Sequence, residues 1–525
     1  MPKALRTLCA AIALLAAVAA PAAATAPPAA AADTRPNVVV LMTDDQTVED
    51  LRAMPETEAL LAGTGVSFTR SYVSYPLCCP SRATYLSGQY AHNHGVLGLY
   101  PPTGGYGRFD ATESLPVWLQ RAGYTTAHIG KYMNGYGTQT SADPPLGWSD
   151  WYGDVGESTY RMWGFTLNEN GVNHTYGTPF DEDPHLYQTD VVTQKAVDVI
   201  DQNARSVQPL FLSVAFLAPH HEGTGMRQYS GRLVRAAPRH VGKLAAKPLP
   251  IPRSFNEYDV SDKPFFLRRR PPLTFAQIDR IERNYHDRQE SLLAVDDGVG
   301  EIVSALERAG ELENTYLIFT SDNGYMQGEH RVPSGKMLPY DPSTQVPLLV
   351  RGPGIPAGQK SGALVANADL APTILDLAGA QPGRLLDGFS LMPFARDPWL
   401  GTQRALLHET GGRKVVGREQ DAAGEPAIKR ILSYKAVRTT RWLYVEYKGG
   451  ARELYDLKAD PAELHSRHRD PRYARTRGAL RRLLMRLAIC AGSDCRAPGR
   501  AIPEPLRRLP SPKRPATSLP GPARR

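Results

Sequence analysis

Residues 78–88 read CCPSRATYLSG and bring a thiol, a proline and an arginine together in one short segment. Pro80 suits the first position of a helix, so we expect Cys79 to be the cap and Cys78 to lie one residue outside the helix. The N–H groups and the dipole at a helix start favour anions and lower the pKa of a thiol. Cys78 is therefore a candidate nucleophile or part of an anion site. The plainer alternative for a cysteine of an exported protein is a buried or disulfide-bonded residue.

The pattern C-x-P-S-R-x-x-x-L-S-G resembles the signature of the type I sulfatases, which belong to the alkaline phosphatase superfamily. The resemblance implies that Cys78 is oxidised after synthesis to Cα-formylglycine, also called 3-oxoalanine. Cys79 takes the unspecified position, because counting from it would place Ser81 where the pattern requires proline. A formylglycine-generating enzyme is then an expected partner during maturation.

Two short, largely apolar runs, 37–42 and 315–320, are typical of parallel strands buried on both faces. Polar residues follow each run, namely Asp44, Asp45, Asp322 and Asn323. Ligands of open α/β sheets lie beyond the carboxyl ends of the strands, so the two pairs can converge. Either pair alone would fit helix caps or turns equally well. The resemblance to the sulfatases implies that these four residues, together with residue 78, are the family's metal ligands. It implies Ca²⁺ as the bound metal, with Mg²⁺ less favoured.

Two more strand-like segments lead into groups that fit the same chemistry. Residues 124–129 precede Lys131, and residues 210–217 precede His220. Lys336 follows the second acidic pair and resembles the family's second lysine. A single lysine is usually a solvated surface group and a single histidine is usually structural, so the resemblance is what makes these residues site candidates, together with Arg82.

The resemblance also implies a mechanism. One hydroxyl of hydrated formylglycine at 78 attacks the sulfur of a sulfate ester, in line with the leaving oxygen, and a covalent sulfo-enzyme results. Arg82, Lys131, Lys336 and the cation hold the sulfate oxygens, where removal of one donor typically costs about 3 kcal/mol. Protonated His220 gives its proton to the departing sugar or phenol oxygen. The second hydroxyl then loses its proton, expels sulfate and restores the aldehyde.

One segment departs from the commonest family pattern, G-K-W-H-L-G. Residues 130–135 read GKYMNG, so Met133 stands where the pattern has histidine and cannot transfer a proton. His330, His94 or a water could then act as the base for sulfate release. The G-K-Y-x-N wording and the stretch 237–264 resemble the N-acetylglucosamine-6-sulfatase subgroup, which indicates a sulfated amino sugar or glycan as substrate.

The strand-like segments alternate with helical stretches such as 280–309 and 368–379, which predicts an α/β sandwich with a large, mostly parallel sheet. After about residue 400, three short strand patterns with a Gly-Gly turn predict an antiparallel meander, as in the small carboxy-terminal subdomain of the superfamily. The expected divisions are a signal peptide at 1–32, a catalytic domain at 33–400 with a basic insertion at 222–275, a subdomain at 401–495 and a disordered tail at 496–525.

Residues 1–32 combine a weakly basic start, an Ala/Leu-rich stretch and small residues near Ala24 and Ala32 that suit cleavage. No later segment reaches the length of a membrane span. We therefore expect a secreted protein without a stable membrane anchor. Cys490 and Cys495 are close enough in sequence for a disulfide, which leaves Cys79 free and buried.

The formal net charge of +8 suggests a polyanion partner until the charges are located. Residues 496–525 hold eight Lys/Arg against Glu504, or +7, in a Pro-rich tail. Residues 222–270 hold eleven Lys/Arg against four acids, another +7. This basic insertion either attracts a sulfated glycan or only solvates a long loop. No nucleic-acid partner is expected.

Three rival functions share much of this pattern. The chain could be an arylsulfatase of broad specificity, or a phosphodiester or phosphonate hydrolase of the same superfamily. It could also be a secreted, calcium-containing glycan-binding protein whose Cys78 is never converted. The complete set of charged site residues favours the sulfuric ester hydrolase (EC 3.1.6 type).

Overall fold

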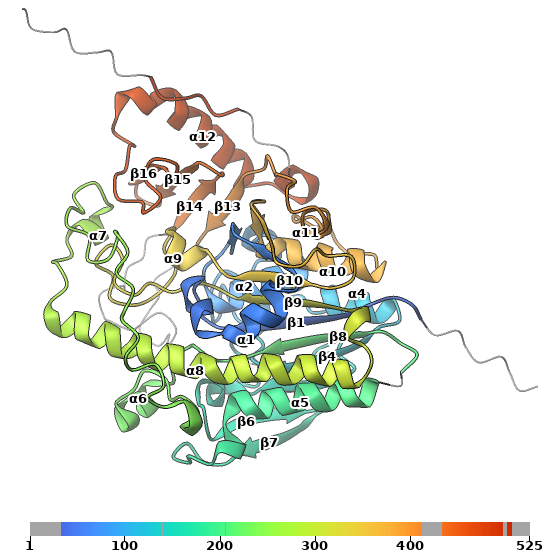
Figure 1. Cartoon of the computed structure of the whole chain (residues 1–525). Helices are drawn as coiled ribbons and strands as arrows, with labels where there is room; N and C mark the ends of the chain where they lie inside the picture. Colours follow the sequence, from blue (N-terminus) through green and yellow to red (C-terminus); the bar gives the residue numbers. More distant parts are fainter. Residues whose placement is uncertain (1–32, 139, 205, 412–432, 497–500, 507–525) are drawn as a thin grey trace, which may run out of the picture.

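The computed structural model describes residues 33–138, 140–204, 206–411, 433–496 and 501–506. The expected signal peptide and most of the expected tail lie outside the described residues. A ten-stranded sheet and a four-stranded sheet organise the rest of the chain, and the small sheet lies beside the large one at the end occupied by the last elements (Figure 1).

The large sheet has the strand order β11-β2-β10-β9-β1-β8-β4-β5-β6-β7. Its central strands β9, β1, β8, β4 and β5 are parallel, and the pairings β9–β10, β10–β2, β5–β6 and β6–β7 are antiparallel. The bounds are β1 Asn37–Thr43, β2 Val66–Phe68, β4 Thr125–Gly130, β5 Asp150–Asp154, β6 Phe165–Glu169, β7 Val172–Tyr176, β8 Leu210–Ala215, β9 Thr315–Ser321, β10 Leu348–Arg351 and β11 Gln359–Ser361. The four strands predicted from the sequence are thus neighbours, and the prediction of a mostly parallel sheet is confirmed.

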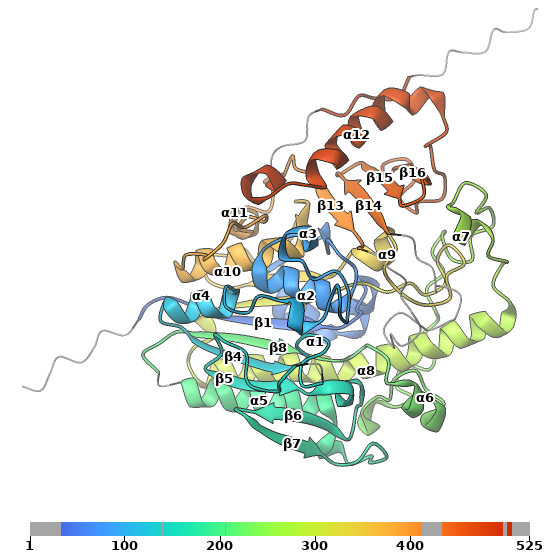
Figure 2. The same ribbon diagram turned by 180° about the vertical axis from the view of Figure 1, so that it is seen from behind.

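Helices cover both faces of this sheet, and the unbroken apolar run of β1 explains why. Val38 and Val40 pack on one face with α2 (Cys78–Ser87), α4 (Leu115–Arg121) and α10 (Leu370–Ala378). Val39 and Leu41 pack on the other face with α5 (Gln188–Asn203) and α8 (Phe275–Arg308). Successive side chains of a strand point to opposite faces, so a strand between two helical layers needs apolar residues at every position. Figure 2 shows the same layers from behind.

Two predicted helices are present with shifted bounds. The long helix begins at Phe275 rather than near residue 280, because Thr274 and Gln277 form a capping box at its start. The second ends where predicted, at Gly379, whose φ of 61° suits a glycine after a helix. The shorter helices are α1 Pro55–Thr57, α3 Ala91–His94, α6 Thr224–Ser230, α7 Phe265–Arg268, α9 Asp341–Thr344 and α11 Met392–Arg396.

The small sheet is antiparallel, as predicted, with strands β13 (Leu406–Glu409), β14 (Tyr434–Arg438), β15 (Trp442–Tyr447) and β16 (Arg452–Asp456). Strand β13 was not predicted, because it is short and lies far in sequence from its partner. Helix α12 (Ala474–Leu487) packs on this sheet. Strands β3 (Ser71–Tyr72) and β12 (Val365–Ala366) form a separate parallel pair.

The predicted disulfide between Cys490 and Cys495 is present, with an S–S distance of 2.01 Å. Cys79 is free and buried, as predicted. Within the described ranges, none of the helices combines the length and apolar character that a bilayer crossing requires.

Some charges of the basic segment 222–275 are paired, while others, such as Lys243, Arg253, Arg268 and Arg269, are exposed. Four of its basic residues take part in ion pairs, namely Arg232, Arg235, Arg239 and Lys263. The segment also packs on the stretch that leads to Lys336, since Phe255 bridges Glu329 and the amide of Asn256 donates to the carbonyl of Gly328 at 2.8 Å. Part of the insertion therefore supports the chain near residue 336.

Candidate active site

Four adjacent parallel strands deliver the candidate residues to one edge of the large sheet. Asp44 and Asp45 follow β1, and Asp322 and Asn323 follow β9. Lys131 follows β4 directly, and His220 lies five residues beyond β8. All six are buried. The structure therefore brings together side chains that lie up to 279 residues apart in the sequence.

The turn after β1 aims both aspartates into the site. Asp45 has a φ of 68°, a left-handed conformation that aspartate tolerates better than most residues. The amide of Asp45 donates to Oδ1 of Asp322 at 3.3 Å, which ties the two strand ends together. Nδ2 of Asn323 donates in turn to Oδ1 of Asp45 at 2.5 Å.

Cys78 lies at the start of α2, and its thiol contacts the site directly. Its Sγ is 3.3 Å from Oδ1 of Asp44 and 2.9 Å from Nζ of Lys336. The helix begins at Cys78 with Leu77 as the cap, so the predicted cap at Cys79 is wrong by two residues. Burial, together with the charge of Asp44, raises the pKa of the Cys78 thiol well above its usual value. The predicted lowering of this pKa is therefore wrong, because loss of water outweighs the helix terminus.

Arg82 lies one helical turn after Cys78, so both side chains leave the same face of α2. Its Nε donates to Oδ2 of Asp322 at 2.8 Å and its Nη1 to the carbonyl of Lys131 at 2.6 Å. Its Nη2 is 3.4 Å from Oδ2 of Asp44. The guanidinium group thus links the ends of β1, β4 and β9 through two carboxylates and one carbonyl.

The two lysines pair with the two aspartates that follow β1. Nζ of Lys131 donates to Asp44, and Nζ of Lys336 donates to Oδ1 of Asp45 at 2.5 Å. Burial alone would raise the pKa of Asp44, but the positive groups Lys131, His220, Arg82 and Lys336 hold it below its ordinary value. Asp44 is therefore a carboxylate in this site.

His220 is oriented by its own loop. Its Nδ1 is 2.7 Å from the carbonyl of His221, and its Nε2 lies 3.7 Å from Oδ2 of Asp45. With Nδ1 turned to the backbone, Nε2 is the ring atom that faces the carboxylates. This is the orientation a proton donor to a substrate in the site requires.

The donor set fits a hard divalent cation. One ligand atom each from Asp44, Asp45, Cys78 and His220 lies within 4.8 Å of the others. Oδ2 of Asp45 and Oδ1 of Asn323 are buried and accept no hydrogen bond from the described residues. Buried oxygens are costly to leave unsatisfied, and carboxylate and amide oxygens are the ligands of Ca²⁺ and Mg²⁺. The basic side chains of Arg82, Lys131 and Lys336 already balance the three carboxylates of the site. A bound divalent cation would therefore give the site a net positive charge.

His94 and His330 were candidates for the base that releases sulfate, but their ring nitrogens contact groups outside the site. Nε2 of His94 is 3.0 Å from the hydroxyl of Thr84, and its Nδ1 accepts from the amide of Val96 at 3.1 Å. Nδ1 of His330 is 2.6 Å from Oε2 of Glu257. Neither histidine lines the pocket beside Lys131.

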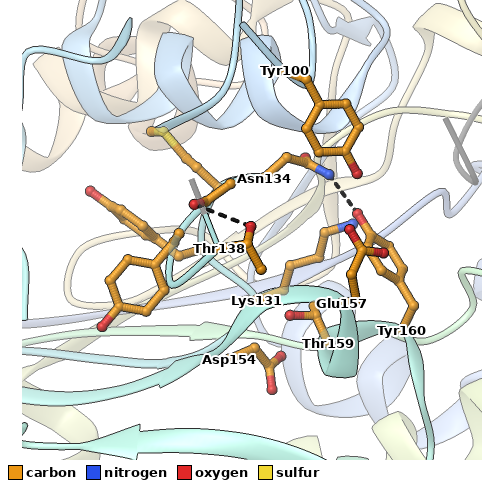
Figure 3. A pocket seen from close by; sticks show the side chains of 13 residues that line it. Tyr100, Lys131, Asn134, Thr138, Asp154, Glu157, Thr159 and Tyr160 are labelled. Carbon is orange, nitrogen blue, oxygen red and sulfur yellow. Dashed lines mark hydrogen bonds between the residues drawn. The ribbon is translucent and has the colours of Figure 1, made fainter. Parts of the chain in front are cut away.

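That pocket is small, about 20 Å³, and lies next to Lys131 and Met133 (Figure 3). Its walls include Asn134, Asp154 and Tyr160, none of which was singled out in the sequence. Asn134 belongs to the G-K-Y-x-N motif, which in the sequence indicated only a resemblance to the N-acetylglucosamine-6-sulfatase subgroup. Asp154 is the last residue of β5 and Tyr160 lies in the turn after it. Neither belongs to a recognisable motif, so no sequence signal pointed to them.

The family model for sulfatases matches residues 36–380. Among curated proteins, the human N-acetylglucosamine-6-sulfatase is 34% identical over 498 residues, which cover 89% of this chain and 86% of that protein. An arylsulfatase of Volvox carteri is 33% identical over 527 residues, covering 90% of this chain and 77% of that protein.

Solved structures confirm the fold. A protein solved in complex with its substrate D-glucosamine-2-N,6-O-disulfate superposes with a TM-score of 0.70 at 24% identity, covering 86% of this chain and 97% of that one. The extent of the family match and the identity to curated sulfatases agree with the resemblance carried by residues 78–88. The chain belongs to the sulfatase family and is a sulfuric ester hydrolase.

Proposed function

We propose that this sulfatase removes sulfate from a sulfated amino sugar, with the 6-O-sulfate of N-acetylglucosamine as the favoured ester. The names of the relatives support this substrate, because N-acetylglucosamine-6-sulfatases of human, goat and cattle are each 34% identical over most of the chain. The G-K-Y-x-N wording at 130–134 supports it independently. The observation that carries the enzymatic assignment is the convergence of Cys78 with two lysines, an arginine and the two carboxylate-bearing strand ends.

Cys78 is proposed to be converted to formylglycine by a formylglycine-generating enzyme. The hydrated aldehyde would supply one hydroxyl to attack sulfur and a second to release sulfate, a pair that a thiol lacks. The position of residue 78 suits this role, because Lys336 and Asp44 contact its side chain from two sides. The raised pKa of the unmodified thiol agrees with a nucleophile that is not the thiolate.

The proposed cation is Ca²⁺, held by Asp44, Asp45, Asp322, Asn323 and residue 78. It would supply positive charge to the sulfate oxygens and to the attacking hydroxyl. Oxygen ligands and the unsatisfied Asp45 and Asn323 oxygens support it. Lys131, Lys336 and Arg82 are proposed to bind sulfate oxygens. The two carboxylate contacts of Arg82 also hold the proposed ligands Asp44 and Asp322 in place.

His220 is proposed to protonate the leaving sugar oxygen. A sugar alkoxide is a poor leaving group, so a positioned acid contributes roughly 100- to 10,000-fold in rate. The hydrogen bond from Nδ1 to the carbonyl of His221 leaves Nε2 to carry that proton. Met133 cannot replace the family histidine as a base, and a water in the pocket beside Lys131 is the candidate we favour for that step.

We propose further that the protein is exported after cleavage of residues 1–32 and that its two domains divide near residue 400. The Cys490–Cys495 disulfide suits an oxidising compartment. The change from a mostly parallel to an antiparallel sheet between β12 and β13 supports the division.

The decisive assay measures sulfate release from N-acetylglucosamine 6-sulfate, compared with galactose 6-sulfate and with the 6-phosphate of the same amino sugar. Preference for the first ester is expected. Preference for galactose 6-sulfate would overturn the amino-sugar assignment, and preference for the phosphate would favour the phosphohydrolase alternative.

A further inference from the structure

Tyr160 lies between the two groups proposed to handle the sulfate and the leaving oxygen. It ends a single 3-10 turn, η4 (Gly156–Tyr160), that follows β5, and its side chain is buried. Nζ of Lys131 lies 4.7 Å from the centre of the tyrosine ring. The ring of His220 lies 5.1 Å away, centre to centre, tilted by 43°. One aromatic ring therefore contacts both Lys131 and His220, which come from different strands.

Both loops that carry these residues are attached to Tyr160. Nδ2 of Asn134, three residues after Lys131, donates to the hydroxyl of Tyr160 at 2.7 Å (Figure 3). The amide of Gly223, three residues after His220, donates to the carbonyl of Tyr160 at 3.0 Å. Close by, the amide of Met162 donates to Oε1 of Glu222 at 2.9 Å. The residue is thus held at its hydroxyl by the first loop and at its backbone by the second.

The ring of Tyr160 fills the space between the Lys131 ammonium and the His220 ring and packs against both. The face of an aromatic ring attracts a cation, most strongly in a site from which water is excluded. The ring therefore attracts the Lys131 ammonium and packs against the His220 ring, while the Asn134 hydrogen bond fixes the orientation of the tyrosine ring.

We propose that Tyr160 is a positioning residue of the sulfatase reaction. Its ring holds the side chains of Lys131 and His220 in their relative positions, and the hydrogen bond from Asn134 fixes the ring. This inference rests on the proposed roles of those two residues. It gives the asparagine of the G-K-Y-x-N segment a physical task, namely to fix the ring that orients the acid.

Two esters with different leaving groups test the proposal, because protonation by His220 matters for a sugar alkoxide and little for nitrophenolate. Tyr160→Leu removes the ring. We expect kcat for N-acetylglucosamine 6-sulfate to fall about 100-fold or more, and kcat for 4-nitrophenyl sulfate to fall about tenfold through Lys131 alone. A merely structural role would lower both rates by the same factor, as partial unfolding does.

Two milder variants keep the test valid if Tyr160→Leu folds poorly. Tyr160→Phe and Asn134→Ala keep the ring and remove one hydrogen bond, so each is expected to lower kcat/KM for the sugar ester about fivefold, with a smaller loss for the nitrophenyl ester. Tyr187→Phe is the matched control, since Tyr187 is also buried and donates one hydrogen bond, to the carbonyl of Arg235 at 3.0 Å. It should leave the ratio of the two rates unchanged.

The possible failures are distinguishable. Equal losses on both esters in the Tyr160 and Asn134 variants, with an active wild-type enzyme, would overturn the positioning role alone. A wild-type protein bearing formylglycine that cleaves neither ester would overturn the proposed function and this inference with it.

Discussion

Removal and return of calcium should change the stability of the protein by a predictable amount. The site buries the carboxylates of Asp44 and Asp45 at 0% exposure and that of Asp322 at 1%. Arg82, Lys131 and Lys336 balance these three charges, yet oxygens of Asp45 and Asn323 remain without hydrogen bonds from the described residues. A cation that binds only the folded state at about 100 times its dissociation constant adds about 2.7 kcal/mol to the free energy of unfolding.

Because the chain is long, this free energy corresponds to a small but measurable shift of the melting temperature. Unfolding entropy is about 2.1 cal/mol/K per residue, so for a protein this long each kcal/mol moves the melting temperature by about 1 °C. Calorimetry of chelator-treated protein should therefore record a rise of about 3 °C when calcium is returned in large excess. Magnesium should produce a smaller rise, because it demands a tighter octahedral geometry.

Matched variants locate the effect. Asp45→Asn keeps the shape of the side chain but removes its charge, so the calcium-dependent rise should disappear. Asp369→Asn is the control, because Asp369 is equally buried and paired with Arg404 at 2.9 Å, outside the site. It should lower the melting temperature and keep the full calcium response. An equal response in wild type and Asp45→Asn, or none in wild type, would refute the assigned ligands.

Three further results follow from the same structure. Cys78→Ala and Cys78→Ser should both abolish sulfate release while leaving the melting temperature within a few degrees of wild type. Wild-type activity in either variant would contradict the formylglycine assignment. Burial raises the pKa of Asp154 to about 8, so the folded state keeps a proton that the unfolded chain loses above about pH 4. Stability should accordingly fall as pH rises from about 4 to 8, by up to about 1.4 kcal/mol per pH unit, and urea titrations of Asp154→Asn should show a flatter dependence; an unchanged slope would contradict the buried, protonated carboxyl. Replacing Cys490 and Cys495 by alanine should cost about 2 kcal/mol of stability without changing kcat, and a large loss of kcat would show that the disulfide supports the site.

The central part of the fold was predictable because buried parallel strands must be apolar at every position. That rule identified β1 and β9 as strands, and the polar residues after them marked the ligand edge of the sheet. Strand β13 escaped prediction because its four residues gain their pairing only from β14, far along the chain. The cap of α2 was misplaced because Pro80 can occupy more than one position in the first turn, and Leu77 gives no capping signal.

The sequence could point to a candidate site residue where a motif names it, but not where only packing in three dimensions defines it. Cys78, Arg82 and the two carboxylate-bearing pairs belong to recognisable sequence motifs. The pKa of Cys78 was predicted in the wrong direction because sequence reveals a helix start but not how completely the thiol is shielded from water. Tyr160 could not be singled out from the sequence, because its contacts with Lys131 and His220 form only in three dimensions.

The most direct test of the account is mass spectrometry of the tryptic peptide that contains residue 78, from protein purified from its own host. Conversion of the thiol to an aldehyde lowers the mass of the peptide by about 18 units, and this is the result we predict. An unmodified thiol in fully folded protein from that host would contradict the proposed mechanism and favour a glycan-binding role.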